Sequence, residues 1–240
     1  MIPLEAVFGP LQLLISVFLA FRLKKSYEKK PESINLRYFF YTFVLLSFAF
    51  GVSALSWSSI DSFKFDFLIS SINIIGRGLI LLAIMFFAYI PLNILEDSFW
   101  LNSTPFVVLI TASMSNIFSL MSLFSYPITP IGKVGSFSIR LHRGDLYTDI
   151  GIAIIGIVAV FLLLLAIYKY WTIIKPEKSG SYVKRRGFLI IGAAVMFLVG
   201  VILNYFVSLR APVTGRVGSE LFYLSGLITF LISVLYRKKD

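Results

Sequence analysis

Long apolar runs separated by short polar stretches extend through the whole chain. An uncharged run of about 18 or more residues is long enough to cross the hydrocarbon core of a bilayer as a helix. Helices are expected because hydrocarbon offers the backbone no other hydrogen-bond partners. Spans are predicted at residues 3–23, 38–57, 68–90, 104–126, 149–171, 188–208 and 218–236. The pattern predicts an all-α membrane protein, a single seven-transmembrane-helix bundle over residues 1–240.

The polar stretch between the fourth and fifth spans has a different pattern. Residues 136–141 read Ser-Phe-Ser-Ile-Arg-Leu, an alternation of polar and apolar positions. A period of two residues is typical of a strand. We therefore predict a small external β-hairpin between helices 4 and 5.

Basic residues indicate the orientation of the bundle. The first span has no basic residue before it and is followed by Arg22, Lys24 and Lys25, so it is predicted to be a retained helix with the N-terminus outside. The basic residues that then face the cytoplasm are Arg22, Lys24, Lys25, Lys29, Lys30, Arg37, Lys169, Lys175, Lys178, Lys184, Arg185, Arg186, Arg237, Lys238 and Lys239. Those outside are Lys64, Lys133, Arg140, Arg143, Arg210 and Arg216. This bias predicts a multi-pass protein of the cell membrane with a cytoplasmic C-terminus.

One predicted cytoplasmic loop departs from the charge rule. Residues 91–103 contain Glu96 and Asp97 but no basic residue. Acidic residues contribute little to topology, so the orientation is unchanged.

Composition agrees with a lipid environment: 58% of the residues are hydrophobic and the mean hydropathy is +0.89. The net charge of +10 comes largely from basic residues that flank spans, where they set topology and contact anionic headgroups, so no nucleic-acid partner is expected. The chain has no cysteine, and its single histidine, His142, lies in the predicted external loop. No metal or cofactor is therefore expected. The absence of cysteine and the single glutamine, Gln12, would suit a thermophile.

Catalytic motifs are also missing from the sequence. We find no HExxH, no phosphate-binding loop and no base near a nucleophile, and the seventh span has no lysine that could hold retinal. The protein is predicted not to be an enzyme.

Ionisable groups inside apolar spans are costly, which makes them the leading candidates for a functional site. Arg77 lies well inside the third span, with Asn73 one turn away on the same face. Its candidate acidic partners occur in the outer halves of other spans, with further amides nearby. The whole candidate set is Arg77, Asn73, Glu5, Asn116, Asp149, Asn204 and Glu220. One interpretation is an outward-facing polar pocket for a small ligand; the alternatives are a structural ion pair or an arginine that extends to the interface.

The fourth span carries a stripe of small polar residues, Thr111, Ser115, Ser119 and Ser122, at helical spacing. Such stripes let helices approach closely and form hydrogen bonds across the contact. Packing is favoured here over a transport path.

Several segments together resemble a known family. They are Thr111–Asn116, the stretch from Gly135 to Tyr147, the pair Arg185 and Arg186 before helix 6, Asn204, and Glu220 in helix 7. This arrangement is similar to the seven-transmembrane amino-terminal sensor region of histidine kinases, although no kinase sequence follows helix 7. The resemblance implies an outer ligand pocket and a helix shift passed to a cytoplasmic partner through residues 169–186 or the tail.

The functional hypothesis is a sensor or receptor-like signalling module that binds a small-molecule ligand and a cytoplasmic or membrane protein partner. Two alternatives stay open. The protein could be a non-catalytic structural or assembly subunit of a larger membrane complex, or a small transporter or channel.

Overall fold

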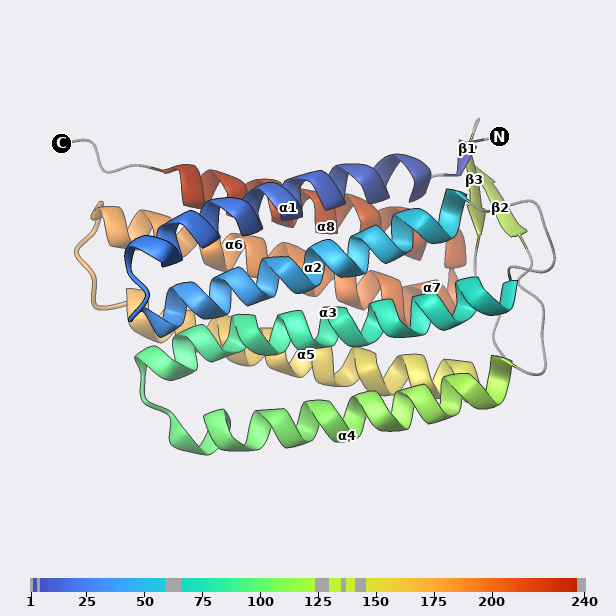
Figure 1. Cartoon of the computed structure of the whole chain (residues 1–240), viewed down its shortest axis with the longest axis horizontal. Helices are drawn as coiled ribbons and strands as arrows, with labels where there is room; N and C mark the ends of the chain where they lie inside the picture. The colour runs from blue at the N-terminus through green and yellow to red at the C-terminus, as the bar shows by residue number, and fades with distance from the viewer. Residues whose placement is uncertain are drawn as a thin grey trace.

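The computed structural model contains seven long helices and a small sheet (Figure 1). It describes residues 2–3, 5–58, 66–123, 130–134, 137–140 and 146–236. The helical elements are α1 (Glu5–Lys29), α2 (Ile34–Ser58), α3 (Asp66–Ile94), α4 (Ser98–Leu123), α5 (Leu146–Ile174), α6 (Tyr182–Ile202), η2 (Leu203–Val207), α7 (Ser208–Arg210) and α8 (Pro212–Leu235). Because η2 and α7 continue α6, they belong to the sixth span. The prediction of seven membrane-spanning helices is confirmed by their length and apolar composition.

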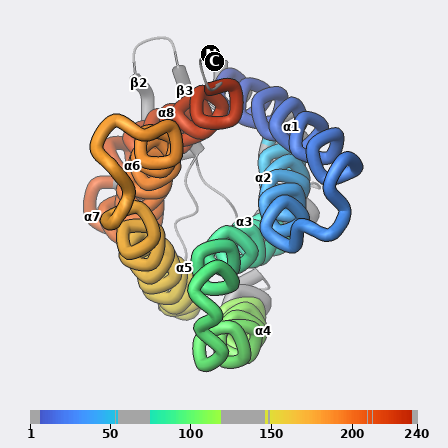
Figure 2. The backbone as a smooth tube through the Cα atoms, turned by 90° about the vertical axis from the view of Figure 1, so that its left-hand side faces the viewer, coloured from blue at the N-terminus to red at the C-terminus, as the bar shows by residue number. Residues whose placement is uncertain are grey.

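Six of these spans form a closed ring when the bundle is viewed along its axis (Figure 2). Around the ring, α1 packs on α2, α2 on α3, α3 on α5, α5 on α6, α6 on α8, and α8 returns to α1. Helix α4 lies outside the ring, where it contacts α3 and α5. As a result α3 is the most buried span and α4 the least.

The helices are longer than the apolar runs that predicted them. At the end of the bundle away from the N-terminus, the described connections cover residues 30–33, 95–97 and 175–181. The predicted bounds of two loops are therefore wrong: the loop expected over residues 91–103 covers residues 95–97, and the one expected over residues 169–186 covers residues 175–181. Lysine and arginine are good helix formers, so α5 continues through Lys169 and α6 begins before Lys184, Arg185 and Arg186.

A small sheet lies beside the N-terminus, at the end of the bundle that we call the sheet end (Figure 1). Strand β2 (Pro130–Val134) pairs antiparallel with β3 (Phe137–Arg140), and β1 (Ile2–Pro3) pairs parallel with β3. The alternating sequence pattern thus coincides with β3, whereas the pairing with β1 was not expected. Leu141, His142 and Lys64 lie outside the described residues. The placement of the sheet end outside the cell stays a prediction from the charge pattern.

The opposite end carries the connections 30–33, 95–97 and 175–181, and we call it the basic end. There Asp97, in the predicted acidic loop, is paired with a basic residue from another helix. The ammonium of Lys169, on α5, donates to Oδ2 of Asp97 at 2.6 Å, and Oδ1 accepts from the backbone N–H of Trp100 at 3.4 Å. Asp97 thus caps α4 and ties it to α5, which accounts for an acidic residue at this end.

Stability is expected to fall in acid through this pair. The hydrogen bond from Lys169 lowers the pKa of Asp97 below its ordinary value. A carboxyl with a lowered folded-state pKa stabilises the fold above its unfolded-state pKa of about 3.9, and this contribution disappears as the pH falls through the folded-state value. The apparent melting temperature of wild type should therefore fall more steeply below about pH 4 than that of Asp97→Asn.

The comparison uses thermal melting in detergent across the pH range. Asparagine is suitable because it can still cap α4 but does not titrate. Parallel melting profiles for the two proteins would show that the Asp97–Lys169 pair contributes nothing to acid sensitivity.

Candidate functional site

A buried polar cluster lies in the half of the bundle nearer the sheet end. Its centre is an ion pair one turn apart on α8, where the guanidinium of Arg216 lies 3.3 Å from a carboxylate oxygen of Glu220. Arg216 also donates to the side-chain oxygen of Asn204, in η2, at 2.9 Å. These bonds join the sixth and seventh spans within the apolar interior.

Helix α1 contributes to the same cluster through Gln12, which is buried. Its side-chain nitrogen donates to Oε2 of Glu220 at 2.8 Å and to the backbone oxygen of the same residue at 3.3 Å. Below it, the hydroxyl of Ser16 donates to the backbone oxygen of Gln12 at 2.7 Å. Glu220 therefore accepts hydrogen bonds from α1 as well as pairing within α8.

The π-helical turn η2 brings Asn204 to this position. A π-turn widens the helix locally and is frequently found at functional sites. The hydroxyl of Ser208 donates to the backbone oxygen of Asn204. Helix α8 approaches this turn so closely that a Cβ atom on Gly215 would lie 2.5 Å from the backbone nitrogen of Ser208 and 2.8 Å from the carbonyl oxygen of Leu203. Glycine is thus required for the two spans to meet.

Arg77 projects from α3 close to this cluster and is partly exposed. Its electrostatic neighbours are Tyr205 in η2 and Arg216 in α8. In the part of the chain that the structure describes, no acidic side chain forms an ion pair with Arg77. Glu220, one of its expected partners, is paired with Arg216 instead.

The remaining predicted residues are distributed as follows. Asn116 lies on α4, outside the ring, and its buried side-chain oxygen has no hydrogen-bond partner among the described residues. Asp149 is half-buried in the first turn of α5 and is engaged in an interaction. Glu5 and Asn73 belong to α1 and α3, but their side chains lie outside the described residues. The structure thus brings together Asn204 and Glu220, with Arg77 nearby.

Sequence reasoning missed Gln12, Arg216 and Tyr205 as members of the cluster. The predicted seventh span starts at residue 218 and leaves Arg216 in an external loop, whereas α8 begins at Pro212 and includes it. The four-residue spacing of Arg216 and Glu220 is the signal that could have identified the pair. Gln12 could have been noticed as an amide within an apolar span.

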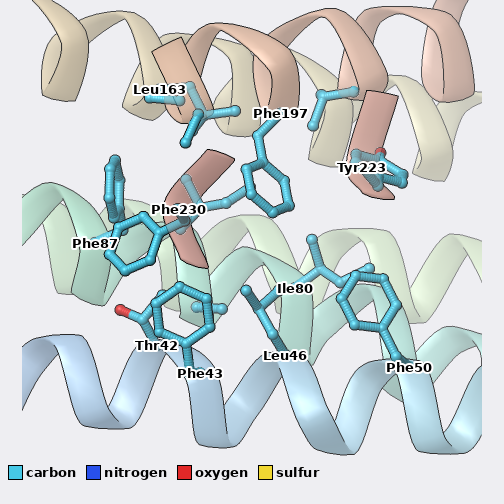
Figure 3. A pocket seen from close by; sticks show the side chains of 15 residues that line it. Thr42, Phe43, Leu46, Phe50, Ile80, Phe87, Leu163, Phe197, Tyr223 and Phe230 are labelled. Atoms are coloured by element: carbon cyan, nitrogen blue, oxygen red, sulfur yellow. The ribbon is translucent and has the colours of Figure 1, made fainter. Parts of the chain in front are cut away.

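A cavity lies inside the ring, between α2, α3, α5, α6 and α8 (Figure 3). It contains about 580 Å³ of space free of atoms, part of it open to the surroundings. Most of this space is too narrow for a molecule, since it has room for roughly three waters. Its lining is apolar apart from Thr42 and Tyr223, and it consists of Thr42, Phe43, Leu46, Phe50, Ile80, Ala83, Ile84, Phe87, Leu163, Ala193, Ala194, Phe197, Val201, Tyr223 and Phe230.

The cavity and the polar cluster adjoin each other along the bundle axis. Arg77 is three residues from the lining residue Ile80 on α3, and Tyr205 is four residues from Val201 in the sixth span. On α8, Glu220 is three residues from Tyr223, which lines the cavity. On each of these spans the polar side chain therefore lies one helical turn nearer the sheet end. The cavity is apolar where the sequence suggested a pocket lined with charges.

The small polar stripe on α4 has a packing role where the structure describes it. Thr111 and Ser115 are buried, and the hydroxyl of Ser115 donates to the backbone oxygen of Gly151 on α5 at 2.8 Å. The side chains of Ser119 and Ser122 lie outside the described residues.

Comparison with protein-family models, curated proteins and solved structures found no match for this chain. The resemblance to histidine-kinase sensor regions thus stays a prediction from the residues. The chain is a multi-pass membrane protein whose six-helix ring holds an apolar cavity next to a basic polar cluster.

Proposed function

We propose that this protein is a receptor-like membrane module that binds a small ligand inside the helix ring and signals to a protein partner at the basic end. The observation that carries the proposal is the cavity beside the cluster of Arg77, Arg216 and Glu220. Ligand sites combine a mostly apolar wall with a few polar groups that fix orientation, and bundles commonly place them between facing helices. The proposal keeps the sheet end outside and the basic end in the cytoplasm, following the charge pattern.

Aromatic contacts support a mechanical connection from the cavity toward the basic end. The ring centroid of Phe230, on α8, lies 4.6 Å from that of Phe43 on α2 and 6.4 Å from that of Phe87 on α3. Phe87 in turn lies 5.4 Å from Tyr170 on α5, and the adjacent Lys169 is paired with Asp97. A molecule that displaced Phe230 would therefore press on four helices, since closely packed interiors have few voids to absorb the change.

Signalling in this proposal is a shift between two packings of the ring. A ligand shifts such an equilibrium only if it binds one packing more tightly than the other. The narrow cavity meets this requirement because a ligand larger than a few waters fits only when the lining side chains or helices move apart. The expanded packing would then be the ligand-bound state.

The proposal can be tested without a ligand by enlarging a lining side chain. Ala194→Phe places a ring in the cavity, whereas Val195→Phe adds one at the neighbouring, outward-facing position of α6. Ala194→Phe should change amide hydrogen exchange in the connections 95–97 and 175–181. Residue 194 lies twelve residues, or about 18 Å, along α6 from the first residue of that helix, Tyr182, so a change in the connection before it would not be a local contact effect.

Hydrogen-exchange mass spectrometry of both variants in nanodiscs provides the readout, with thermal melting to verify folding. The Val195→Phe variant should match wild type at the basic end. If the folded Ala194→Phe variant alters exchange only in the peptides that line the cavity, the ring does not couple its interior to the basic end and the receptor proposal fails.

A further inference from the structure

We propose that the ligand is a single-chain amphipathic anion, a medium-chain carboxylate, with its hydrocarbon chain in the cavity and its head group beside Arg77. This inference rests on the proposed function, because it takes the cavity to be a ligand site. Three features carry it: the chemistry of the lining, the length of the cavity and the charge at its sheet end.

The lining offers hydrogen bonds at one end only. The hydroxyl of Thr42, at the opposite end of the cavity, already donates to the backbone oxygen of Tyr38 at 2.9 Å. The other lining residues between it and Tyr223 are aliphatic or phenylalanine. A polar group placed among them would lose its hydration without gaining a partner, so this part of the ligand must be hydrocarbon.

The length and width of the cavity indicate the length and number of the ligand's hydrocarbon chains. On α6 the lining extends from Ala193 to Val201, a separation of eight residues, which is about 12 Å along the helix axis. An extended alkyl chain advances about 1.3 Å per carbon, because each C–C bond is about 1.5 Å long, so roughly 8 to 10 carbons cover this distance. The cavity is also narrow, which favours one chain over the two chains of a phospholipid or a fused ring system.

The groups at the sheet end of the cavity suit an oxyanion. Arg77 has no acidic partner among the described residues, and its neighbour Arg216 adds a second positive charge that Glu220 balances. The hydroxyl of Tyr205 is buried, in a side chain 2% exposed, and has no hydrogen-bond partner in the described part of the chain. The hydroxyl of Tyr223, in a side chain 5% exposed, lies beside the side chain of Asn204. Buried polar groups are normally paired, and both hydroxyls can donate to a carboxylate.

The binding test uses radiolabelled decanoate and equilibrium dialysis against nanodiscs of neutral phosphatidylcholine, with and without the full chain. Empty discs measure simple partitioning into lipid. We expect discs that contain the protein to retain one additional, saturable decanoate per protein. Unlabelled decanoate should displace it at least about tenfold better than 1-decanol, which has the same chain without the charge, because hydrogen bonds to charged groups are stronger than neutral ones.

Variants separate the head-group site from the chain site. Arg77→Gln should weaken decanoate binding about tenfold and remove the preference over decanol, whereas Arg77→Lys should retain that preference. Ala194→Phe should abolish saturable binding, and the outward-facing Val195→Phe should not. If both Arg77 variants melt like wild type but neither prefers decanoate over decanol, the charge of residue 77 does not bind the head group, and this assignment would be overturned.

An anionic bilayer lipid also combines a negative head group with hydrocarbon chains, so a further experiment must distinguish it from a free acid. Dialysis is repeated in phosphatidylglycerol discs and corrected with empty discs of the same lipid. Retained saturable binding supports a free single-chain acid, whereas its loss would assign the site to an anionic lipid and overturn the proposal. Absence of saturable decanoate binding in neutral discs would also overturn it.

These outcomes are distinct from failure of the receptor proposal. If decanoate does not bind but Ala194→Phe still alters exchange at the basic end, the ligand class is wrong and the coupling stands. If decanoate binds without any change in exchange at the basic end, the ligand class is right and the receptor function is wrong.

Discussion

Replacement of Glu220 by alanine is expected to lower the free energy of unfolding by about 3–5 kcal/mol. The carboxylate is 8% exposed, pairs with Arg216 and accepts from Gln12. Its removal leaves the guanidinium of Arg216 without its partner on α8 and takes from the amide of Gln12 the carboxylate acceptor, so that only the backbone oxygen of residue 220 remains to it. A buried ion that loses its partner keeps its desolvation cost without the compensating attraction, which is why the expected effect is large. Reversible unfolding in mixed micelles measures it.

An exposed ion pair on α1 provides the matched control. Lys24 and Glu28 are also one turn apart and lie 3.8 Å from each other, but their side chains are 56% and 59% exposed. Glu28→Ala should cost no more than about 0.5 kcal/mol, because water and salt screen the charges. Equal losses of unfolding free energy in the two variants would mean that solvent reaches the Arg216–Glu220 pair. The proposed head-group site beside Arg77 would then not be an environment of low polarity.

Replacement of Gly215 by alanine is the second change with a large expected effect, about 3 kcal/mol or more. The added Cβ would approach the backbone of Ser208 and Leu203 to less than 3 Å. A flexible side chain could avoid the added Cβ by changing its rotamer, but backbone atoms cannot. Helix α8 must therefore move away from η2, or the π-turn must rearrange. Either movement would also lengthen the contact between Arg216 and Asn204, which joins the same two elements.

Gly78 on α3 is the control for this substitution. A Cβ atom there meets no heavy atom within 4 Å. Gly78→Ala should therefore be neutral, or stabilising by up to about 1 kcal/mol through its higher helix propensity. Thermal melting of the two variants side by side gives the comparison. A Gly215→Ala variant that melts like wild type would contradict the close approach of α8 to η2.

The position of the cavity beside the polar cluster changes the interpretation of Arg77. The sequence suggested a polar pocket around this residue, a structural ion pair with an acid, or an arginine that extends to the interface. In the structure the expected acid Glu220 pairs with Arg216, whereas Arg77 has no ion-pair partner among the described residues and lies one turn from an apolar cavity. Arg77 is thus placed to receive an anion whose remaining part is hydrocarbon.

The number and nature of the spans follow from local properties of the chain. Apolar runs of sufficient length must become helices in hydrocarbon wherever they lie in the fold. The strand pattern around Phe137 is equally local, and β3 forms there. Helix ends were less predictable, because residues 91–94 and 98–103 continue as helix beyond the apolar runs. The predicted seventh span, which starts at residue 218, consequently excludes Arg216, although this residue lies in α8.

Which helices meet, and therefore which polar groups pair, was decided only by the tertiary structure. Lipid tails are as apolar as a protein interior, so the faces of a span that contact lipid and protein carry similar residues. The pattern accordingly could not place α4 outside the ring or show that Ala194 lines a cavity while Val195 faces outward. Gln12 and Glu220 are 208 positions apart. Their contact exists because the ring closes between α1 and α8, a long-range arrangement that no local pattern encodes.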